Sequence, residues 1–533
     1  KISRKAEKVY IYAHLRSDED TSNTTYQAMM NKIDAYMAEY ATYTAYVVPE
    51  ILSLPDGTIE KLMNEYKELE PYKFLLENIL KEKPHVLNKQ EEELLAAASD
   101  CLDAPSAIHN IMTNADMKFG NIKDEDGEVV ELTEGNYSSF IKSKDREVRK
   151  VAFEKLFGEY KNFENTLATT LSSSIKVFNF GAKVRHYNSA LEASLKPNDI
   201  PLEVYTNAIA TIDKNLSSLH RYVALKKRLL GVDEMHMYDL YVPVIEVPKE
   251  RVEFDKAVEM AVEGLQPLGK EYLDIFQGGI NGGWIDKYIN KGKRGGAYSW
   301  GGYDTKPYVL LNYNYELNDV STLVHEMGHS IHSYYSRKEQ SYYYAGYTLF
   351  CAEVASTTNE ALLIHHLINK ETDKKKKLYL INQELEQIRT TVFRQLMFAE
   401  FELYTHESFE KGIPLTAEDY NAKWHELNVK YFGPDMVVDN DIDIEWARIP
   451  HFYSDFYVYQ YATGYAAASA FAKSILNNEP NAVEKYVGFL KSGGSDYPIE
   501  ILKKAGVDMT TSKPLEATID RFNELLDMLE KEI

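Results

Sequence analysis

Two histidines one helical turn apart, with a glutamate after the first, could do chemistry together: His325, Glu326 and His329. Residues four apart lie on one face of a helix, so the two imidazoles would project together, close enough to bind one tetrahedral metal ion. Glu326 would lie beside the pair without being a ligand, where its carboxylate could take a proton from a water molecule that the metal holds. This spacing predicts a hydrolytic zinc site.

The residues around this motif predict the helix that must hold it. Apolar side chains recur at helical spacing over residues 320–335, and Asn318 or Asp319 could cap the first turn. Gly328 lies inside this helix, where glycine costs about 1 kcal/mol relative to alanine. We therefore expect a backbone or a substrate to approach the helix closely at Gly328.

A catalytic zinc ion usually has three protein ligands, so a third must lie elsewhere in the chain. A histidine ten residues after His325 would complete one known zinc-peptidase pattern, but that residue is Tyr335. Glu353 and Glu360 share one face of another predicted helix, and from their spacing either could reach the metal. His332 lies on the stripe of the two metal-binding histidines, and it suits either a direct role or a place in the core.

Helical periodicity dominates the rest of the chain, so we predict a mostly α fold. The predicted helices cover residues 24–46, 56–69, 72–83, 89–102, 145–171, 202–229, 254–276, 353–369, 376–411 and 416–431. The last of these begins with Thr416 and Asp419 in capping-box register and ends at Gly433 and Pro434.

Two stretches depart from the helical pattern. Residues 118–132 contain short alternating runs around Asp126 and Gly127, which predicts a β-hairpin, and we place a domain boundary there. Residues 278–302 are rich in glycine and lead into a β-prone apolar run at 308–315. We expect this run to form a small sheet beside the metal-binding helix.

The composition is that of a large, soluble globular protein. The chain has 533 residues, 44% hydrophobic and 27% charged, with a formal net charge of -22. This negative charge disfavours binding to nucleic acid or to an anionic membrane, and no apolar run reaches the roughly 18 residues of a membrane helix. Cys101 and Cys351 are too few for a disulfide framework, so we expect a reducing compartment, the cytoplasm.

Several segments resemble those of known zinc metallopeptidases. Residues 324–332 (VHEMGHSIH) and 352–360 (AEVASTTNE) are similar to the signature pair of the oligoendopeptidase F group, in the thimet-oligopeptidase-like family. Residues 291–298, 307–313, 451–464 and 497–508 resemble further segments of that family. The likeness extends from Glu7 to the C-terminus, and because the family usually carries additional N-terminal sequence, we expect this chain to be trimmed at its start.

The resemblance implies a fold and a division into domains. The implied fold is a large, two-lobed helical metallopeptidase with a small β-sheet next to the active-site helix and a deep substrate channel. An N-terminal helical domain of the oligopeptidase F type would cover residues 1–117, and a zinc peptidase catalytic domain would cover residues 118–533. One zinc ion per chain and oligopeptide substrates are implied with it.

The resemblance also assigns the site residues by position. Glu353 matches the third zinc ligand, beside His325 and His329, and Glu360 matches a carboxylate that supports a ligand histidine. Such an outer acceptor is what a metal-bound imidazole needs.

Further positions match the family's catalytic and substrate-binding segments. The donors implied for the oxyanion of the reaction are His451, Tyr457, Tyr461 and Tyr465. An aromatic cluster can equally be core packing, which is the alternative for all four. The segment implied to pair with an extended peptide is Gly295, Gly296, Ala297 and Tyr298, for which the alternative is a surface loop.

These observations together predict a zinc endopeptidase that hydrolyses short, unstructured oligopeptides, with Glu326 as the general base. A dipeptidyl carboxypeptidase or carboxypeptidase of related architecture is an alternative, and it would need a fixed cation for the free C-terminal carboxylate. A catalytically silent, zinc-containing peptide-binding protein is another alternative, against which the presence of Glu326 argues.

Overall fold

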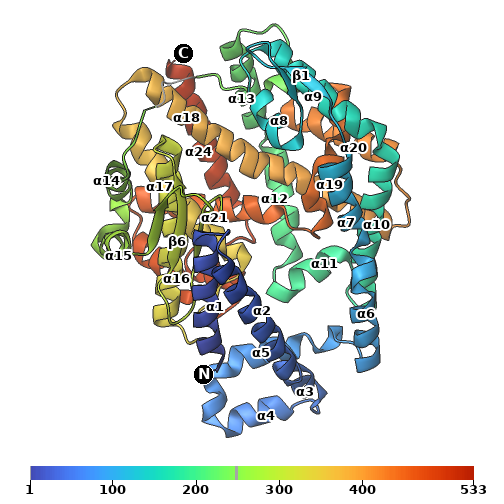
Figure 1. The fold of residues 1–533 in the computed structure, drawn as a ribbon, viewed down its shortest axis with the longest axis vertical. Coiled ribbons are helices and arrows are strands. Elements are labelled where there is room, and N and C mark those ends of the chain that lie inside the picture. Colours follow the sequence, from blue (N-terminus) through green and yellow to red (C-terminus); the bar gives the residue numbers. More distant parts are fainter. Residues whose placement is uncertain (1, 246–249, 533) are drawn as a thin grey trace. The chain divides into compact units, whose positions relative to one another are not determined.

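The computed structural model describes residues 2–245 and 250–532, and this part of the chain is mostly α-helical, as predicted (Figure 1). It forms two compact units, each assembled from three separate stretches of sequence. Unit 1 takes the described residues of 1–84, 248–371 and 464–509, and unit 2 those of 85–247, 372–463 and 510–533. A boundary at residue 118 divides the chain in sequence order instead, and it stays a prediction.

Helices form most of unit 1. They are α1 (Ile2–Glu19), α2 (Thr24–Thr44), α3 (Val47–Ser53), α4 (Thr58–Glu65), α5 (Lys73–Lys81), α14 (Phe254–Gly264), α15 (Gly269–Asn281), α16 (Leu317–Glu339), α17 (Leu349–Lys370), α22 (Ala482–Ser492) and α23 (Pro498–Lys504). α21 (Tyr459–Leu476) begins in unit 2 and belongs to unit 1 from Gly464 onward.

Helix α16 contains the metal-binding motif and begins earlier than predicted. Its N-cap is Glu316, so the expectation of a cap at Asn318 or Asp319 is wrong. Asp319 instead lies at the third helical position, where its Oδ2 accepts a hydrogen bond from the Glu316 N–H at 2.8 Å and closes a capping box. Leu323 and Met327, on the apolar stripe, are fully buried, so the helix is anchored on its core face.

A three-stranded sheet lies beside α16, which confirms the predicted small sheet. Its order is β4 (Ile285–Tyr288), β6 (Tyr308–Tyr313), β5 (Tyr298–Trp300). β6 pairs in parallel with β4 and antiparallel with β5, so β5 is an edge strand. The hydroxyl oxygens of Ser299 in β5 and Ser330 in α16 lie 2.8 Å apart and join the edge strand to the metal-binding helix.

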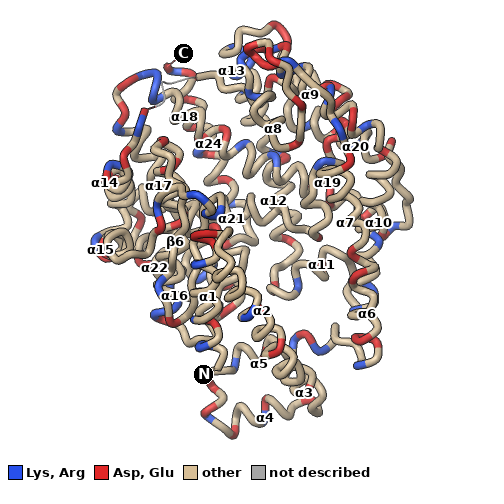
Figure 2. Tube along the Cα trace, in the orientation of Figure 1, with Lys and Arg blue, Asp and Glu red and all other residues tan. Residues whose placement is uncertain are grey.

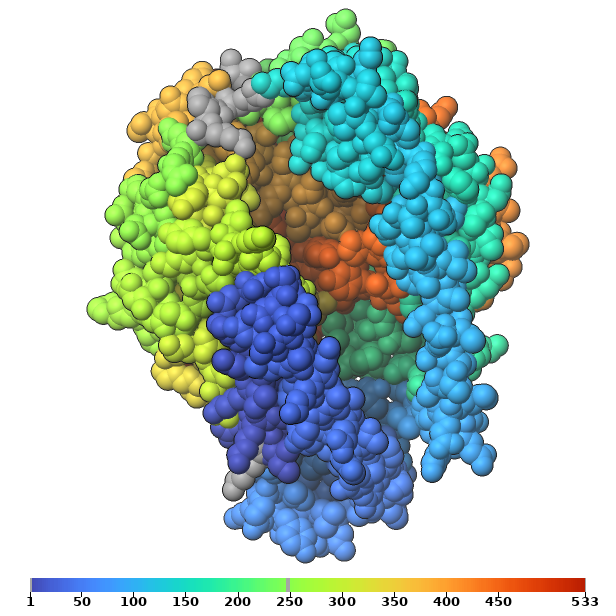
Figure 3. All heavy atoms as spheres, in the orientation of Figure 1, coloured from blue at the N-terminus to red at the C-terminus, as the bar shows by residue number. Residues whose placement is uncertain are grey.

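Helix α1 packs against the segment that precedes and forms this edge strand. The Thr21 N–H donates to the Gly292 carbonyl at 2.7 Å, and the Arg294 N–H donates to the Asp18 carbonyl at 2.9 Å. The Tyr298 hydroxyl donates to Oδ2 of Asp18 at 2.7 Å. In Figure 3 the blue N-terminal residues accordingly lie against the yellow-green segment.

Unit 2 is also built mainly of helices. They are α6 (Lys89–Leu102), α7 (Ala104–Ile111), α8 (Glu134–Phe140), α9 (Arg146–Asn162), α10 (Glu164–Val184), α11 (Ala190–Leu195), α12 (Leu202–Lys214), α13 (Leu216–Leu230), α18 (Lys374–Ile388), α19 (Arg394–Glu410), α20 (Ala417–Phe432) and α24 (Lys513–Glu532). The predicted hairpin is confirmed: β1 (Asn121–Lys123) and β2 (Val129–Glu131) pair antiparallel across a turn in which Gly127 has a φ of 82°. β3 (Met235–His236) and β7 (Met436–Val437) form a short parallel pair.

Four predicted helices are each two helices in the structure: in one, residues 376–411, a π-helical turn at Arg389–Phe393 joins α18 and α19, and the other three are interrupted by a break. The chain leaves helical geometry at Phe163 between α9 and α10, at Asn215 between α12 and α13, and at a turn that contains Pro267 between α14 and α15. The helical spacing of apolar residues continues across each break, so this spacing did not reveal the breaks. Pro267 alone indicated one of them, because proline interrupts a helix. The capping box of Thr416 with Asp419 is confirmed at the start of α20.

Acidic and basic residues are interspersed along the described chain (Figure 2). Within the described residues, no helix combines the length and the apolar character that crossing a bilayer requires.

Candidate metal centre

The two histidines of the motif lie on one face of α16. Their Nε2 atoms are 3.2 Å apart, and both rings are partly buried. The i, i+4 spacing in a regular helix produces this arrangement, as predicted from the sequence.

A second helix, α17, passes very close to α16 at Gly328. A Cβ at this position would lie 2.7 Å from the Cα of Ser356 and 2.9 Å from the carbonyl oxygen of Ala355. The close approach predicted for Gly328 is therefore that of the α17 backbone. It brings Glu353, one turn earlier in α17, to the two histidines.

Glu353 completes a triangle of ligand atoms. Its Oε2 lies 3.4 Å from Nε2 of His325 and 3.5 Å from Nε2 of His329. Ligands about 2.0 to 2.1 Å from a tetrahedral zinc ion are separated by about 3.3 to 3.4 Å, so these three atoms fit such an ion. Two imidazoles and one carboxylate are also a donor set that catalytic zinc uses.

Glu360, the other candidate for third ligand, contacts only one of the two histidines in the described structure, His325. Its Oε2 is 3.2 Å from Nδ1 of His325, on the side of the ring away from Glu353. The Ser321 hydroxyl donates to the other oxygen of Glu360 at 3.1 Å, and the Ser356 hydroxyl donates to Oε2 of Glu353 at 3.1 Å. Both carboxylates are thus held by side chains of α16 and α17.

Sequence reasoning missed three residues that hold this centre. Ser321 precedes His325 by one turn and Ser356 follows Glu353 by nearly one turn, so helical spacing could have found both. The third is Asn359, fully buried between helices, whose Nδ2 donates to the Val324 carbonyl at 2.9 Å. Its only signal in the sequence was its place, one turn after Ser356, on the helix face that also carries Ala355, Leu362 and Leu363.

The acid-base properties of the centre follow from burial and from the density of carboxylates. Burial raises the pKa of Glu326 to about 7, and the neighbouring Glu353 and Glu360 also raise it. Burial lowers the pKa of His325, but the hydrogen bond and charge of Glu360 outweigh burial and raise this pKa to about 9. Burial and the neighbouring His325 lower the pKa of His329. A carboxyl with a pKa near 7 can both take up and release a proton at neutral pH.

His332 is a core residue in the structure. It is 1% exposed, its ring stacks on Tyr347 with centroids 3.7 Å apart, and burial lowers its pKa to about 3. Its imidazole is therefore neutral at neutral pH, and it packs from α16 against Tyr347, which precedes α17.

The four aromatic candidates fall in both units. His451, Tyr457 and Tyr461 form a cluster in unit 2, with the hydroxyl of Tyr461 lying 3.4 Å from Nε2 of His451 and 3.5 Å from the hydroxyl of Tyr457. Tyr465 lies in unit 1 and is 7% exposed. Its neighbour Gly464 packs near Glu353, since a Cβ on Gly464 would lie 3.7 Å from that of Glu353.

The glycine-rich candidates lead into the edge strand β5. Gly295, Gly296 and Ala297 precede it, and Tyr298 is its first residue. Gly296 has a φ of 82°, a conformation that glycine adopts without strain. The Asn312 side chain donates to the Gly296 carbonyl at 2.7 Å and fixes this turn against β6.

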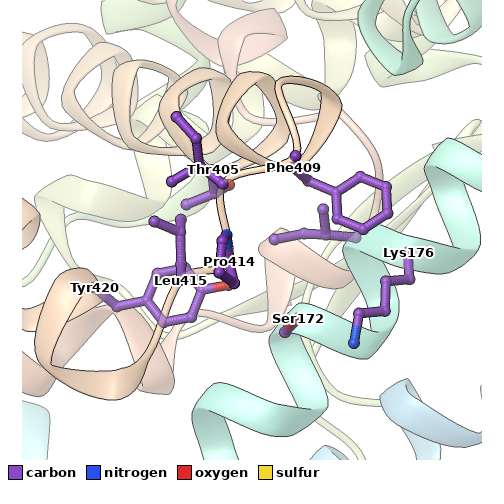
Figure 4. A pocket seen from close by; sticks show the side chains of 10 residues that line it. Ser172, Lys176, Thr405, Phe409, Pro414, Leu415 and Tyr420 are labelled. Atoms are coloured by element: carbon purple, nitrogen blue, oxygen red, sulfur yellow. The ribbon is translucent and has the colours of Figure 1, made fainter.

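A separate pocket of about 290 Å³ opens in unit 2 (Figure 4). Side chains of α10, α19 and α20 line it, among them Lys176, Phe409 and Tyr420. None of the predicted site residues lines this pocket.

Comparison with known proteins agrees with this geometry. Peptidase family M3 matches residues 139–521, and Oligopeptidase F matches residues 50–119. The chain is 49% identical to Oligopeptidase PepF of Bacillus subtilis over 531 residues, which is 100% of this chain and 79% of that protein. It is 42% identical to the group B oligopeptidase PepB of Streptococcus agalactiae, over 99% of this chain and 88% of that protein.

Solved structures share its fold. A crystal structure from Chlamydophila abortus has a TM-score of 0.96 at 40% identity and covers 100% of this chain and 89% of that one. Oligoendopeptidase-F from Enterococcus faecium has a TM-score of 0.77 at 42% identity, over 99% of this chain and 91% of that one. These matches and the geometry of the histidine and glutamate side chains show that the chain belongs to peptidase family M3 and is a metalloendopeptidase.

Proposed function

We propose that this metalloendopeptidase hydrolyses internal bonds of short, unstructured oligopeptides with one zinc ion held by His325, His329 and Glu353. The observation that carries this proposal is the triangle of ligand atoms, with sides of 3.2, 3.4 and 3.5 Å, beside the buried carboxyl of Glu326. The bound ion would acidify a water molecule and polarise the carbonyl of the scissile peptide.

Glu326 acts as the general base in this proposal. Its pKa of about 7, raised by burial, suits a group that takes a proton from the attacking water and then passes it to the leaving amine. Glu360 keeps His325 in the orientation that metal binding needs, because it lies 3.2 Å from the ring nitrogen that does not face Glu353.

We propose that His451, Tyr457, Tyr461 and Tyr465 supply hydrogen-bond donors for the oxyanion of the tetrahedral intermediate. The mutual contacts of His451, Tyr457 and Tyr461, and the packing of Gly464 near Glu353, support this role. Replacing each tyrosine by phenylalanine removes one hydroxyl and keeps the ring, so a donor should show a lower kcat at unchanged KM.

Gly295, Gly296, Ala297 and Tyr298 are proposed to align the substrate. The edge position of β5 supports this, because an extended peptide can pair with an edge strand through its backbone. Backbone pairing binds peptides of many sequences, which suits an enzyme for oligopeptides.

We place the enzyme in the cytoplasm, with oligopeptides as its partners and neither nucleic acid nor a membrane among them. The net charge of -22 and the two free cysteines support this assignment.

A mixture of peptides blocked at both ends, roughly 5 to 20 residues long, tests the proposed activity. We expect internal cleavage, detected by mass spectrometry, that a chelator abolishes and that added zinc restores. Glu326→Gln, prepared in parallel, controls for a contaminating peptidase. Cleavage that survives the chelator would overturn the proposal, and so would the absence of cleavage of the blocked peptides when the same peptides without blocking groups lose terminal residues.

A further inference from the structure

A buried glutamate of α19 holds the chain just before the tyrosines of α21. Glu402 is 2% exposed, and its Oε1 accepts a hydrogen bond from the Phe456 N–H at 2.9 Å. Its second oxygen, Oε2, is buried, and the nearby hydroxyl of Tyr205, which donates to the Ala399 carbonyl at 2.8 Å, lowers the pKa of Glu402. A buried carboxyl in an apolar setting needs a reason to be there, because burial disfavours it.

Phe456 itself has an unusual backbone. Its φ is 48°, in the left-handed region that residues with a Cβ seldom adopt. Its ring is 0% exposed and packs between Tyr205 and His406, with centroid distances of 5.5 and 4.6 Å. Strained residues of this kind persist where the surroundings determine them, and here the ring packing and the Glu402 carboxyl do so.

The strained residue lies inside the turn that carries the aromatic cluster. The Ser454 N–H donates to the His451 carbonyl at 2.9 Å, and the Tyr457 N–H donates to the Ser454 carbonyl at 3.1 Å. His451 and Tyr457 then stack with ring centroids 5.8 Å apart and an interplanar angle of 13°. The backbone angle at Phe456 therefore determines how Tyr457 faces His451.

We propose that Glu402 is a positioning residue: by holding the Phe456 N–H it keeps His451, Tyr457 and Tyr461 in the arrangement that turnover requires. This inference rests on the proposed role of that cluster in the reaction. Glu402 acts through the turn and touches none of the three side chains through a hydrogen bond in the described structure.

The protonation state of Glu402 makes the inference testable by a conservative variant. Burial raises its pKa well above the ordinary value, and the nearby, half-buried Asp455 raises it further. Both effects favour the neutral acid, and Oε1 accepts from the Phe456 N–H at 2.9 Å. Glutamine has the same shape and the charge of that neutral acid, and its oxygen can accept the same hydrogen bond.

We expect Glu402→Gln to keep kcat within about twofold of the wild type. Glu402→Leu removes the acceptor and should lower kcat on the order of tenfold to a hundredfold, with unchanged KM and zinc content, since displaced catalytic groups cost this much. Glu402→Asp, which keeps the acid but shortens its reach, should lower kcat in the same way and serves if the leucine variant does not fold.

Glu384→Leu is the matched control. Glu384 is 4% exposed in α18 of the same unit, where it accepts two hydrogen bonds from Arg521 at 2.8 Å. This variant should lower Tm as much as Glu402→Leu does and leave kcat unchanged, so loss of stability alone cannot account for a loss of kcat.

A double-mutant cycle locates the effect. In the Tyr457→Phe background, Glu402→Leu should lower kcat by clearly less than it does in the wild type, because part of what it positions is gone.

Wild-type kcat in a folded Glu402→Leu or Glu402→Asp variant would overturn the inference. If His451→Gln, Tyr457→Phe and Tyr461→Phe all keep wild-type kcat, the proposed role of the cluster is wrong, and so is the inference that rests on it. If these variants lower kcat and Glu402→Leu does not, the role of the cluster stands and only the inference about Glu402 is wrong.

Discussion

Glu326 and the neighbouring His325 share the same buried, negatively charged surroundings, and burial acts on their pKa values in opposite directions. Glu326 is 7% exposed, and Glu353 and Glu360 add to the effect of burial on its pKa. The same carboxylates favour the charged form of His325. At the residue scale, one group of acids thus raises the pKa of both the proposed base and a proposed ligand, and His325 must give up its proton when a metal ion binds.

The first prediction concerns this base. Glu326→Gln keeps the shape of the side chain and removes its ability to take a proton, so we expect kcat to fall by on the order of 10² to 10⁴-fold. Zinc content by atomic emission and Tm should stay close to the wild type. Near wild-type turnover would exclude Glu326 as the base.

The second prediction concerns the ligands. His325→Ala, His329→Ala and Glu353→Ala should each lose stoichiometric zinc, because two ligands hold the ion poorly. Glu360→Gln should keep most of the zinc and bind it less tightly, by on the order of 10 to 100-fold, as expected of an outer partner. Full zinc occupancy in Glu353→Ala with loss of zinc in Glu360→Gln would show that Glu360 is the third ligand and Glu353 the supporting carboxylate.

The third prediction concerns pH. Burial lowers the pKa of His406 to about 3, whereas a histidine in the unfolded chain has a pKa of about 6.5. Between these values the unfolded chain binds more protons, so stability is lost as pH falls below about 6.5. At pH 5 the expected loss from this residue is about 2 kcal/mol. His406→Gln should therefore show a flatter dependence of Tm on pH between 7 and 5, and an unchanged slope would contradict the assignment.

At the scale of elements, the crossing of α16 and α17 decides the geometry of the site. Gly328 lets the α17 backbone come close, and Asn359 links the two helices through the Val324 carbonyl. Buried polar links of this kind are costly to break, so the crossing is held in one arrangement.

The fourth prediction follows from this crossing. Gly328→Ala would place a Cβ 2.7 Å from the Ser356 Cα, and because backbone atoms cannot give way as a flexible side chain can, the helices must separate. We expect a loss of stability of about 1 to 3 kcal/mol and weaker zinc binding, since Glu353 moves with α17. Gly488→Ala, in the interior of α22 with open space around it, should be neutral or stabilising. Equal zinc affinity in the wild type and Gly328→Ala would show that the site tolerates the shift.

At the scale of the whole molecule, the chain crosses between its two units several times, and each unit contains stretches far apart in the sequence. The metal-binding helices lie in unit 1, and most of the aromatic candidates lie in unit 2. The proposed pairing of the substrate backbone with β5 requires a substrate that is locally unfolded.

The fifth prediction is that the enzyme cleaves unstructured peptides of roughly 5 to 20 residues and leaves folded proteins intact. A stable protein and the same protein after reduction and alkylation, digested side by side and analysed by mass spectrometry, provide the comparison. Efficient digestion of the folded form would contradict the prediction.

Local rules in the sequence were enough to predict the helix that carries His325 and His329, the capping box of Thr416 with Asp419, the hairpin around Gly127 and the mostly α class. Each depends on residues a few positions apart, whose relation is set by helix or turn geometry. Spacing also put His325 and His329 on one face. The breaks at Phe163 and Asn215 were not predictable in this way, because the apolar period continues through them.

Only the tertiary structure decided which glutamate of α17 faces both histidines. Glu353 and Glu360 are equivalent by spacing, and their difference arises from the point at which α17 crosses α16, set by the contact of Gly328 with Ala355 and Ser356. The buried contact of Glu402 with Phe456 likewise joins residues 54 positions apart in the sequence, whose proximity depends on the packing of helices. Sequence spacing determines which side chains share a face, and packing determines what that face meets.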